Sequence, residues 1–347
     1  MAICSRRAED ATVTTQTISA GAFPTALPAD AHAPEVPGTQ EGWVTLVAQL
    51  TSETKNAYLA KPDFLLGHAA QERATARDYA GRELLELVQN AADAATEAGV
   101  RSRVRIELRP DALFVANTGA PFSLDGVRSL MTPNTSDKAR RKRGLIGAKG
   151  LGFRALLNWS GEPFISSGAL GIGFHRRHAL RQAAEIADRS VRLGQLLDSA
   201  DPQVPVLAFP LVGEELNAFD EGAAAGRRRR ALALRTEGYD TVVAAGLTAE
   251  KHGRALAQVR EFEPSFLLFV DSIEEVAIQV EGEPELRWSR RHLQGDEVVL
   301  KIERSGDVEE QRWVCRRRTG QVARPSSAAR GYELALAFRK ETPEPGR

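Results

Sequence analysis

The spacing of apolar residues changes along the chain, and each spacing predicts a type of element. From Trp43 onward apolar residues recur every three or four positions, which is typical of helices, and a second helical pattern over about 69–98 ends at Gly99. Residues 104–108 then alternate between apolar and charged, and the run 112–116 is apolar. A Pro-Asp turn separates the two, so we expect adjacent antiparallel strands.

Further along the chain, the spacing of apolar residues predicts fewer helices and more strands. A strand begins at Thr241, and a helix is expected over 248–262. Beyond about 271 several short alternating segments follow, with Ser-Gly-Asp at 305–307 as a hairpin turn. Residues 1–40 are rich in Ala, Thr, Pro and Gly without apolar periodicity, so a disordered leader is expected.

One predicted helix has an unusual polar face. Glu86, Asn90 and Asp93 are spaced i, i+4 and i+7, so their side chains lie on the same side within two turns. The opposite side is apolar and reads as a buried stripe: Leu84, Leu85, Val88, Ala91, Ala92 and Ala95. For this helix alone, an ordinary solvated face is the favoured explanation. A ligand-binding face is the alternative.

Two later segments favour the ligand-binding explanation. The apolar strand ends in Asn117-Thr-Gly119, and a polar connection over 123–143 leads into a glycine-rich loop with Gly147, Gly150 and Gly152. Backbone N–H groups of such a loop approach polyphosphates closely, and a following helix N-terminus favours negative charge. A glycine loop alone is weak support. The ordered combination of helix, strand and loop is far more specific.

These segments resemble the ATP-binding site of the GHKL (Bergerat-fold) superfamily, which includes heat-shock-protein-ninety chaperones, MutL, gyrase B subunits and histidine kinases. The residues ELVQNAADA at 86–94 match the E-L-x-x-N-A-x-D-A box, and 147–153 match the G-x-x-G-x-G-F lid motif. NTGAPFS, IGAKGLGFRALL and the stretch YDTVVAAGL to FEPSFLLFVDSIEEVAI are most similar to the sacsin-type N-terminal ATP-binding domain, also called the Nov domain. The resemblance covers about 45–280.

The resemblance implies a fold and a domain organisation. The fold is an α/β (α+β) two-layer sandwich, with helices on one face of a mixed, mostly antiparallel sheet. The ATP-binding domain spans 41–280, with a lid over about 131–152 and an exposed insertion over about 219–238. A short β-rich extension follows at 281–347.

The resemblance also assigns roles to individual residues. Glu86 becomes the general base that orients the water attacking the γ-phosphate, with Glu83 as a weaker rival. Asn90 ligates Mg²⁺ through its amide oxygen, which suffices because magnesium takes its other ligands from water and phosphates. Asp93 lies near the sugar and base. Asn117 replaces the aspartate that reads adenine in other branches, so it accepts a hydrogen bond without a charge.

The remaining assigned residues are nucleotide-binding and lie in three places. Gly119 lets the backbone pass under the base, and Thr241 bonds adenine through water. The other members belong to the lid: Gly147, Lys149, Gly150, Gly152 and Phe153. An Asn-Thr-Gly turn closing a hairpin is the ordinary alternative for Asn117, and a solvated loop lysine is the alternative for Lys149.

Composition narrows the function classes. Net charge is zero and the isoelectric point is about 7.0, so the basic runs at 138–143 and 227–230 read as solvated loops, with nucleic acid as the less favoured alternative. The two cysteines, Cys4 and Cys315, are far apart and lack metal-ligand spacing. With no apolar run of membrane-spanning length and no signal-peptide pattern, a cytoplasmic protein is expected.

We expect an ATP-binding domain with slow ATPase activity, in which lid closure drives a conformational change or acts on a homodimer or client protein. The cofactors are ATP and Mg²⁺. One alternative is a nucleotide-sensing or interaction module that binds weakly without hydrolysis. A second is a DNA-transaction ATPase, which is less favoured because the β-rich tail is too short for a transducer domain.

Overall fold

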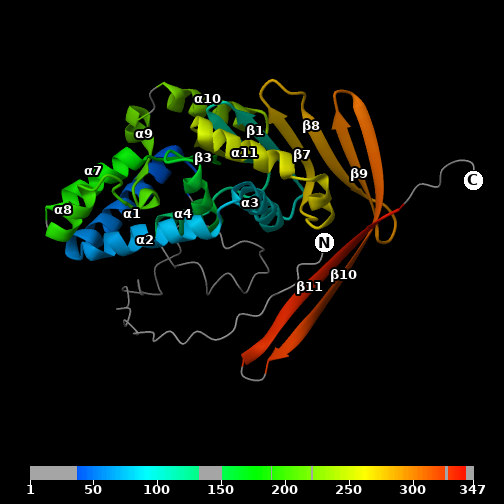
Figure 1. Cartoon of the computed structure of the whole chain (residues 1–347), viewed down its shortest axis with the longest axis horizontal. Helices are drawn as coiled ribbons and strands as arrows, with labels where there is room; N and C mark the ends of the chain where they lie inside the picture. Colours follow the sequence, from blue (N-terminus) through cyan, green and yellow to red (C-terminus); the bar gives the residue numbers. More distant parts are fainter. Residues whose placement is uncertain (1–36, 133–150, 189, 220–221, 325–326, 341–347) are drawn as a thin grey trace, which may run out of the picture. The chain divides into compact units, whose positions relative to one another are not determined.

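An 11-stranded sheet organises the chain, in the strand order β11-β10-β9-β8-β7-β1-β2-β6-β3-β4-β5 (Figure 1). The computed structural model describes residues 37–132, 151–188, 190–219, 222–324 and 327–340. The strands are β1 Ser102–Arg109, β2 Ala112–Asn117, β3 Phe164–Ser167, β4 Leu170–Phe174, β5 Pro210–Leu211, β6 Thr241–Gly246, β7 Ile273–Val280, β8 Leu286–His292, β9 Glu297–Arg304, β10 Asp307–Arg324 and β11 Ser327–Arg339.

The helices pack mainly against the strands from β1 to β5 in this order. They are α1 Gln40–Ala60, α2 Asp63–Asp78, α3 Glu83–Ala98, α4 Leu124–Met131, α6 Leu151–Ala155, α7 Arg176–Ala187, α8 Val191–Leu197, α9 Gly213–Phe219, α10 Ala223–Thr236 and α11 Ala249–Glu261. Short 3-10 helices occur at η1 Leu156–Asn158, η2 Val206–Ala208 and η3 Pro264–Leu268. None of these described helices is long and apolar enough to cross a membrane.

The sheet is mixed and mostly antiparallel, as expected. β1 pairs antiparallel with β2 but parallel with β7, whereas the other neighbours pair antiparallel. The parallel pair joins strands about 170 residues apart along the chain, with Val104 opposite Val276. β1 is therefore the strand at which two antiparallel segments of the sheet meet. Strands β8 to β11, from the predicted extension, continue this sheet beyond β7.

The main core lies between α3 and the central strands. The predicted apolar stripe of α3 is buried at Leu84, Val88, Ala91, Ala92 and Ala95. It packs in one cluster with alternate residues of β1 and β2, namely Val104, Ile106, Leu108, Leu113 and Val115. The helix and strand periods thus present matching apolar faces, which stabilises this layer pair.

The prediction of one continuous helix over 69–98 is wrong, because the segment forms two helices. The chain forms α2 and α3 with a break at residues 79–82, where Gly81 has φ +83°. A left-handed residue interrupts the helix, and α3 restarts with its own apolar face toward the sheet. The predicted end at Gly99 is confirmed, since this residue is the left-handed cap of α3 at φ +66°.

The segment 219–238, expected as an exposed insertion carrying a basic loop at 227–230, is also different. Its arginine run lies within α10, a helix that covers the sheet face opposite α3. Ala231 and Leu234 are fully buried there against Phe114 and Ala116 of β2. β2 is consequently buried on both faces. Two of its four arginines point inward to carboxylates that are buried or half-buried, so the run is not a solvated loop.

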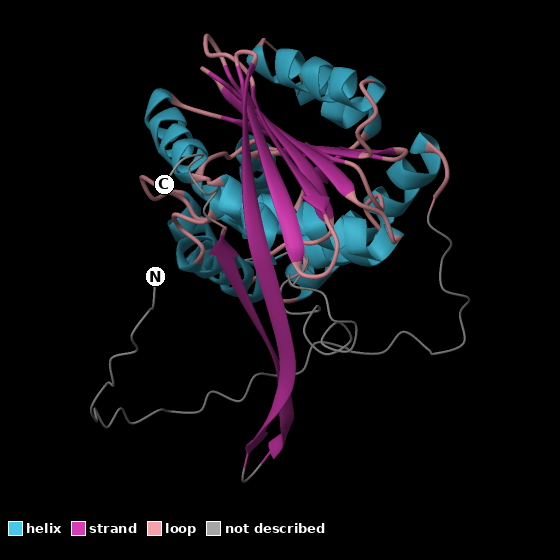
Figure 2. Cartoon of the chain, turned by 90° about the vertical axis from the view of Figure 1, so that its right-hand side faces the viewer, coloured by secondary structure: helices cyan, strands magenta, loops and turns pink. Residues whose placement is uncertain are grey.

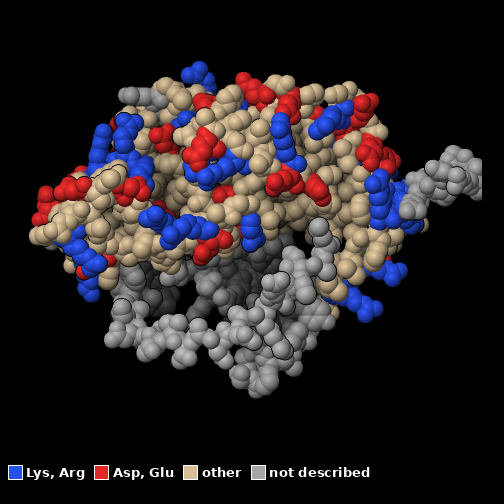
Figure 3. Space-filling model, viewed as in Figure 1, with Lys and Arg blue, Asp and Glu red and all other residues tan. Residues whose placement is uncertain are grey.

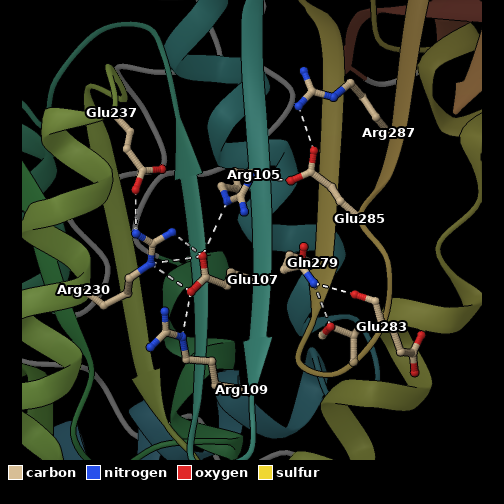
Figure 4. Close-up of polar contacts among 10 residues, drawn as sticks. Arg105, Glu107, Arg109, Arg230, Glu237, Gln279, Glu283, Glu285 and Arg287 are labelled. Atoms are coloured by element: carbon tan, nitrogen blue, oxygen red, sulfur yellow. Dashed lines mark hydrogen bonds and ion pairs between the residues drawn. The ribbon is translucent and has the colours of Figure 1, made fainter. Parts of the chain in front are cut away.

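Glu107 of β1 is the centre of an ion-pair cluster under α10 (Figure 4). Its carboxylate, 3% exposed, accepts hydrogen bonds from Arg109 at 2.7 Å and from Arg230 at 2.6 Å, with Arg105 at 3.5 Å. Burial raises the pKa of Glu107, but the hydrogen bonds and charges of Arg230 and Arg109 outweigh it and leave the pKa lowered. Arg230 also pairs at 2.6 Å with Glu237, the C-terminal cap of its own helix, while its contact with Glu107 joins α10 to β1.

On the face seen in Figure 3, acidic and basic side chains are interspersed over the described surface. An arginine that forms an ion pair with a carboxylate, as Arg230 does with Glu107, contributes little to the electrostatic field outside the protein.

Replacing Arg230 with alanine should destabilise the protein by about 2 kcal/mol, because a buried carboxylate loses its strongest donor while retaining two weaker cationic neighbours. The measurement is the free energy of unfolding in urea. Arg229→Ala is the matched control, since Arg229 is exposed on the same helix. Equal stability of the two variants would show that the Glu107 pair does not hold α10.

Candidate functional site

Glu86 occupies the first turns of α3 and is 6% exposed. Its Oε1 atom accepts a hydrogen bond from Arg82 at 3.2 Å. Burial raises the pKa of this carboxyl, and the Arg82 charge opposes that shift. Its Oε2 atom faces Gly152 of α6 so closely that a Cβ atom on Gly152 would lie 2.6 Å away. Glycine at 152 therefore allows the backbone of α6 to approach the predicted base.

Glu83, the rival carboxylate, is held by two amide side chains. Its Oε1 atom accepts from Asn158 at 3.0 Å, and its Oε2 atom accepts from Gln258. Gln258 also accepts from the backbone N–H of Leu84 at 3.1 Å, and Asn158 donates to the carbonyl of Ala76 at 2.7 Å. Glu83 thus ties α2, α3, η1 and α11 together. Both carboxylate oxygens of Glu83 are therefore engaged in side-chain hydrogen bonds.

Asn90 and Asp93 continue the polar face of α3 toward its C-terminal end. Asn90 is partly exposed, whereas Asp93 is 1% exposed. An amide oxygen at Asn90 is a suitable ligand for a hard cation that keeps most of its waters. Glu86 and Asp93 are about 10 Å apart along the helix axis, at 1.5 Å per residue. Glu86 and Asp93 are therefore far enough apart to contact different parts of one ligand.

Gly119 lies directly on the backbone of α3. A Cβ atom at this position would be 2.9 Å from the carbonyl carbon of Ala94 and from the nitrogen of Ala95. Its φ of +138° also disfavours any L-residue. The next residue, Ala120, donates its N–H to the carbonyl of Ala94 at 2.9 Å. This contact places the end of β2 beside Asp93.

Asn117 and Thr241 face each other across β2 and β6, and both are buried. The backbone carbonyl of Asn117 accepts from Asp240 at 2.9 Å, and its side-chain N–H donates to the carbonyl of Thr118 at 3.2 Å. The hydroxyl groups of Thr241 and Ser167 are hydrogen-bonded at 2.6 Å. The structure therefore brings Asn117, Gly119 and Thr241 together.

Two residues that the sequence motifs do not identify hold this arrangement. Asp240 accepts the N–H of Gly119 through Oδ2 at 2.9 Å, and Ser167 accepts the N–H of Phe122 at 2.9 Å. Both stand at strand ends, next to a predicted strand or a glycine. That position was the available signal, but neither residue type marks a ligand site alone.

Phe153 does not lie on the surface of the site. It is 2% exposed and packs against Phe174, with ring centroids 6.2 Å apart. Its side chain anchors α6 in the core, as expected for a large aromatic ring. Gly147, Lys149 and Gly150, with most of the predicted lid and the basic run 138–143, fall outside the described residues.

A buried polar cluster lies behind α6. Arg154, 3% exposed, donates to the carbonyls of Ser129 at 3.0 Å and Thr132 at 3.1 Å at the end of α4. Glu72 of α2 accepts from the N–H groups of Val206 at 2.7 Å and Leu207 at 3.1 Å. Burial raises the pKa of Glu72 to about 7, although these bonds and Arg154 oppose the shift.

His68 belongs to the same cluster. Its Nδ1 atom is hydrogen-bonded to the hydroxyl of Tyr58, and burial, with the charge of Arg154, lowers its pKa to about 3. His68 is therefore neutral over the physiological pH range.

Comparison with known proteins gives one distant, partial similarity. Protein NO VEIN of Arabidopsis thaliana is 26% identical over 196 residues, which is 55% of this chain and 6% of that protein. No protein-family model matches the chain. The similarity indicates a relation between this chain and a short stretch of NO VEIN.

Gly119→Ala should lower the free energy of unfolding by more than about 2 kcal/mol, because the added methyl group meets rigid backbone and a φ of +138°. Gly99→Ala is the control for backbone strain without a clash: its φ is +66° and nothing lies within 4 Å. It should cost about 1 kcal/mol. Urea unfolding of both variants measures the difference, and equal costs would contradict the close approach.

Glu72→Gln should change how stability depends on pH. Between its ordinary pKa of 4.5 and about 7, folded Glu72 keeps a proton that the unfolded chain releases, so the contribution of Glu72 to stability falls as pH rises. His68 acts in the opposite sense, because the unfolded chain gains a proton below 6.5 that folded His68 refuses. The two contributions offset each other in wild type.

The variant removes the Glu72 contribution, so its stability should fall more steeply than wild type on acidification from pH 6.5 to 4.5, by about 1 kcal/mol per pH unit. Urea unfolding across this range measures the slope, which is insensitive to any constant cost of the substitution. Parallel pH profiles for the two proteins would show that Glu72 titrates normally.

Proposed function

We propose that this chain is a Mg²⁺-dependent ATP-binding domain of the GHKL type, closest to the sacsin-type domain, with slow ATPase activity that couples lid closure to a conformational change. The motif resemblance over about 45–280 is the starting point. The observation that carries the proposal is the contrast between two carboxylates on α3. Glu83 is locked by Asn158 and Gln258, whereas Glu86 has a raised pKa and sits against Gly152.

A general base for hydrolysis needs a carboxylate beside the phosphate-binding loop. Gly152 is the last glycine of the proposed lid motif, and its contact with Glu86 would bring that carboxylate next to a γ-phosphate bound by the loop. A raised pKa makes the carboxylate a better proton acceptor from water. Arg82, hydrogen-bonded to Oε1, would orient the group.

Magnesium would bind at the middle of the same face. Asn90 would contribute one oxygen, with phosphate oxygens and water completing the shell. The bound ion supplies charge neutralisation of the phosphates. Glu86 and Asn90 are one helical turn apart, so the base and the metal ligand would both lie at the phosphate end of the nucleotide.

Adenine and ribose would lie near the far end of α3. Asn117 and Thr241 are paired there, and the contact of Gly119 with Ala94, the residue after Asp93, would bring Asp93 to the same end of the site. Thr241 shares its hydroxyl with Ser167, which would leave it able to bind the base through water. An uncharged Asn117 gives a weaker hydrogen bond to the base than aspartate, so modest affinity is expected.

The weak-binding, non-hydrolysing sensor remains the second candidate, favoured by one feature. Asn117 already donates to the carbonyl of Thr118, so part of its hydrogen-bonding capacity is used within the chain. A sensor would show nucleotide binding without turnover.

The test is calorimetric titration of the full chain with ATP and GTP, with and without Mg²⁺, together with a phosphate-release assay. Wild type should bind ATP in a Mg²⁺-dependent manner, and Asn90→Ala should lose this dependence. Glu86→Gln should retain binding but lose at least about 100-fold in turnover. Glu97→Gln, at an exposed position on the same helix, is the control and should behave as wild type.

Three outcomes would overturn the proposal or change its assignments. Absence of ATP binding by the folded wild-type chain would overturn it entirely. Binding without turnover in wild type would favour the sensor. Loss of turnover in Glu83→Gln at unchanged stability, with Glu86→Gln active, would reverse the assignment of the base.

A further inference from the structure

β11 forms the outer edge of the sheet, and its outward face is apolar. Within the described residues the strand order ends at β11, which pairs only with β10. Leu334, Leu336 and Phe338 alternate along it and are 51%, 48% and 57% exposed. The intervening residues are Ala335 and Ala337, so five consecutive positions carry no charge and no proline.

The ribbon made by β10 and β11 also extends past its neighbour. β9 pairs with β10 only from Asp307 to Val314, and the later part of β10 pairs with β11 alone. Figure 2 shows this two-stranded ribbon continuing beyond the other strands. Edge strands usually carry charges, prolines or bulges that block pairing with another chain. The segment 334–338 has none of these, so it is competent to accept a further strand.

We propose that the occupant of this edge is a second copy of the chain, paired antiparallel through β11 about a two-fold axis at Leu336. In that register Leu334 of each copy stands opposite Phe338 of the other, Ala335 stands opposite Ala337, and Leu336 stands opposite itself. In this register the two copies place their large apolar side chains on one face of the joined sheet and their alanines on the other.

The sequence around the axis is self-complementary in charge as well. Glu333 and Arg339 are equally far from Leu336, so the same register opposes an acidic and a basic position at both ends. A two-fold contact requires this kind of self-match, because the same patch serves both partners. The proposal does not depend on nucleotide binding.

The basic residues on the same face do not prevent the contact. Arg316 and Arg318 of β10 pair with Leu336 and Leu334, so they lie one strand away from the edge. In the dimer the two β10 strands would be separated by three strand spacings, about 14 Å. This distance exceeds the Debye length of about 8 Å at physiological ionic strength, so the repulsion is largely screened.

The contact is small, so a weak and reversible dimer is expected. A few paired residues bury far less than the roughly 1,200 Å² of a stable interface. Sedimentation equilibrium of the full chain, from about 1 to 200 µM, should show a monomer–dimer equilibrium with micromolar affinity. Nucleotide-free protein is used, so that failure here is independent of failure of the proposed ATP site.

Leu336→Lys tests the axis, because it places two like charges directly opposite each other. The dissociation constant should rise at least about tenfold. Val308→Lys is the matched control: Val308 is 55% exposed on β10, before the segment that pairs with β11, and should leave the equilibrium unchanged. Circular dichroism melting confirms that both variants fold.

Register is tested by cysteine cross-linking in a chain with Cys4→Ser and Cys315→Ser. Leu336→Cys should form a disulfide-linked dimer on mild oxidation, because residues opposed across an antiparallel pair have Cα atoms about 4.5–5.5 Å apart. Leu334→Cys alone should link poorly, but a mixture of Leu334→Cys and Phe338→Cys chains should link efficiently.

Three results would overturn the proposal. They are a wild-type chain that stays monomeric over the whole concentration range, a Leu336→Lys variant that dimerises as well as wild type, and cross-linking that ignores the register. Recruitment of a different partner strand by a monomeric chain would assign the edge to that partner instead.

Discussion

The backbone-to-backbone contact between Gly119 and α3 is the constraint on which the arrangement of the candidate site depends. Apolar burial between α3 and the central strands stabilises the layer pair, but it tolerates small shifts of one layer over the other. The hydrogen bond from Ala120 to the carbonyl of Ala94 removes that freedom. Because Gly119 has no side chain, its backbone contacts the backbone of α3 directly, and this contact fixes the distance between the turn and the helix. That distance in turn sets where Asp93 lies relative to Asn117 and Thr241.

Much of this frame could be predicted from local patterns. The apolar stripe of α3 apart from Leu85, which is only partly buried, is confirmed, as are the left-handed cap at Gly99, the β1–β2 hairpin and the start of β6 at Thr241. Each depends on a period or a turn residue within about ten positions. The polar face of α3 follows from the same helical period, which is why Glu86, Asn90 and Asp93 could be grouped before their surroundings were known.

What could not be predicted depends on distant contacts. Glu83 and Glu86 look alike in the sequence, and they differ only because Asn158 and Gln258, far along the chain, bind Glu83. The arginine run in α10 resembles a solvated loop until Glu107 and Glu162 are placed beneath it. Phe153 matched a nucleotide-binding motif, yet the core takes its ring. The burial of a charge or a ring is decided by partners that a local pattern does not contain.

The parallel pairing of β1 with β7 means that β1 lacks one of its partner strands during much of the protein's synthesis. β2 covers one edge of β1 within a few residues, but β7 emerges about 170 residues later. At about 5–20 residues per second, a ribosome needs about 10–30 s to deliver it. For that time the nascent chain carries an unpaired strand edge at the centre of its future sheet. Any fragment that stops before Ile273 keeps that edge permanently, and is expected to aggregate or to need a chaperone.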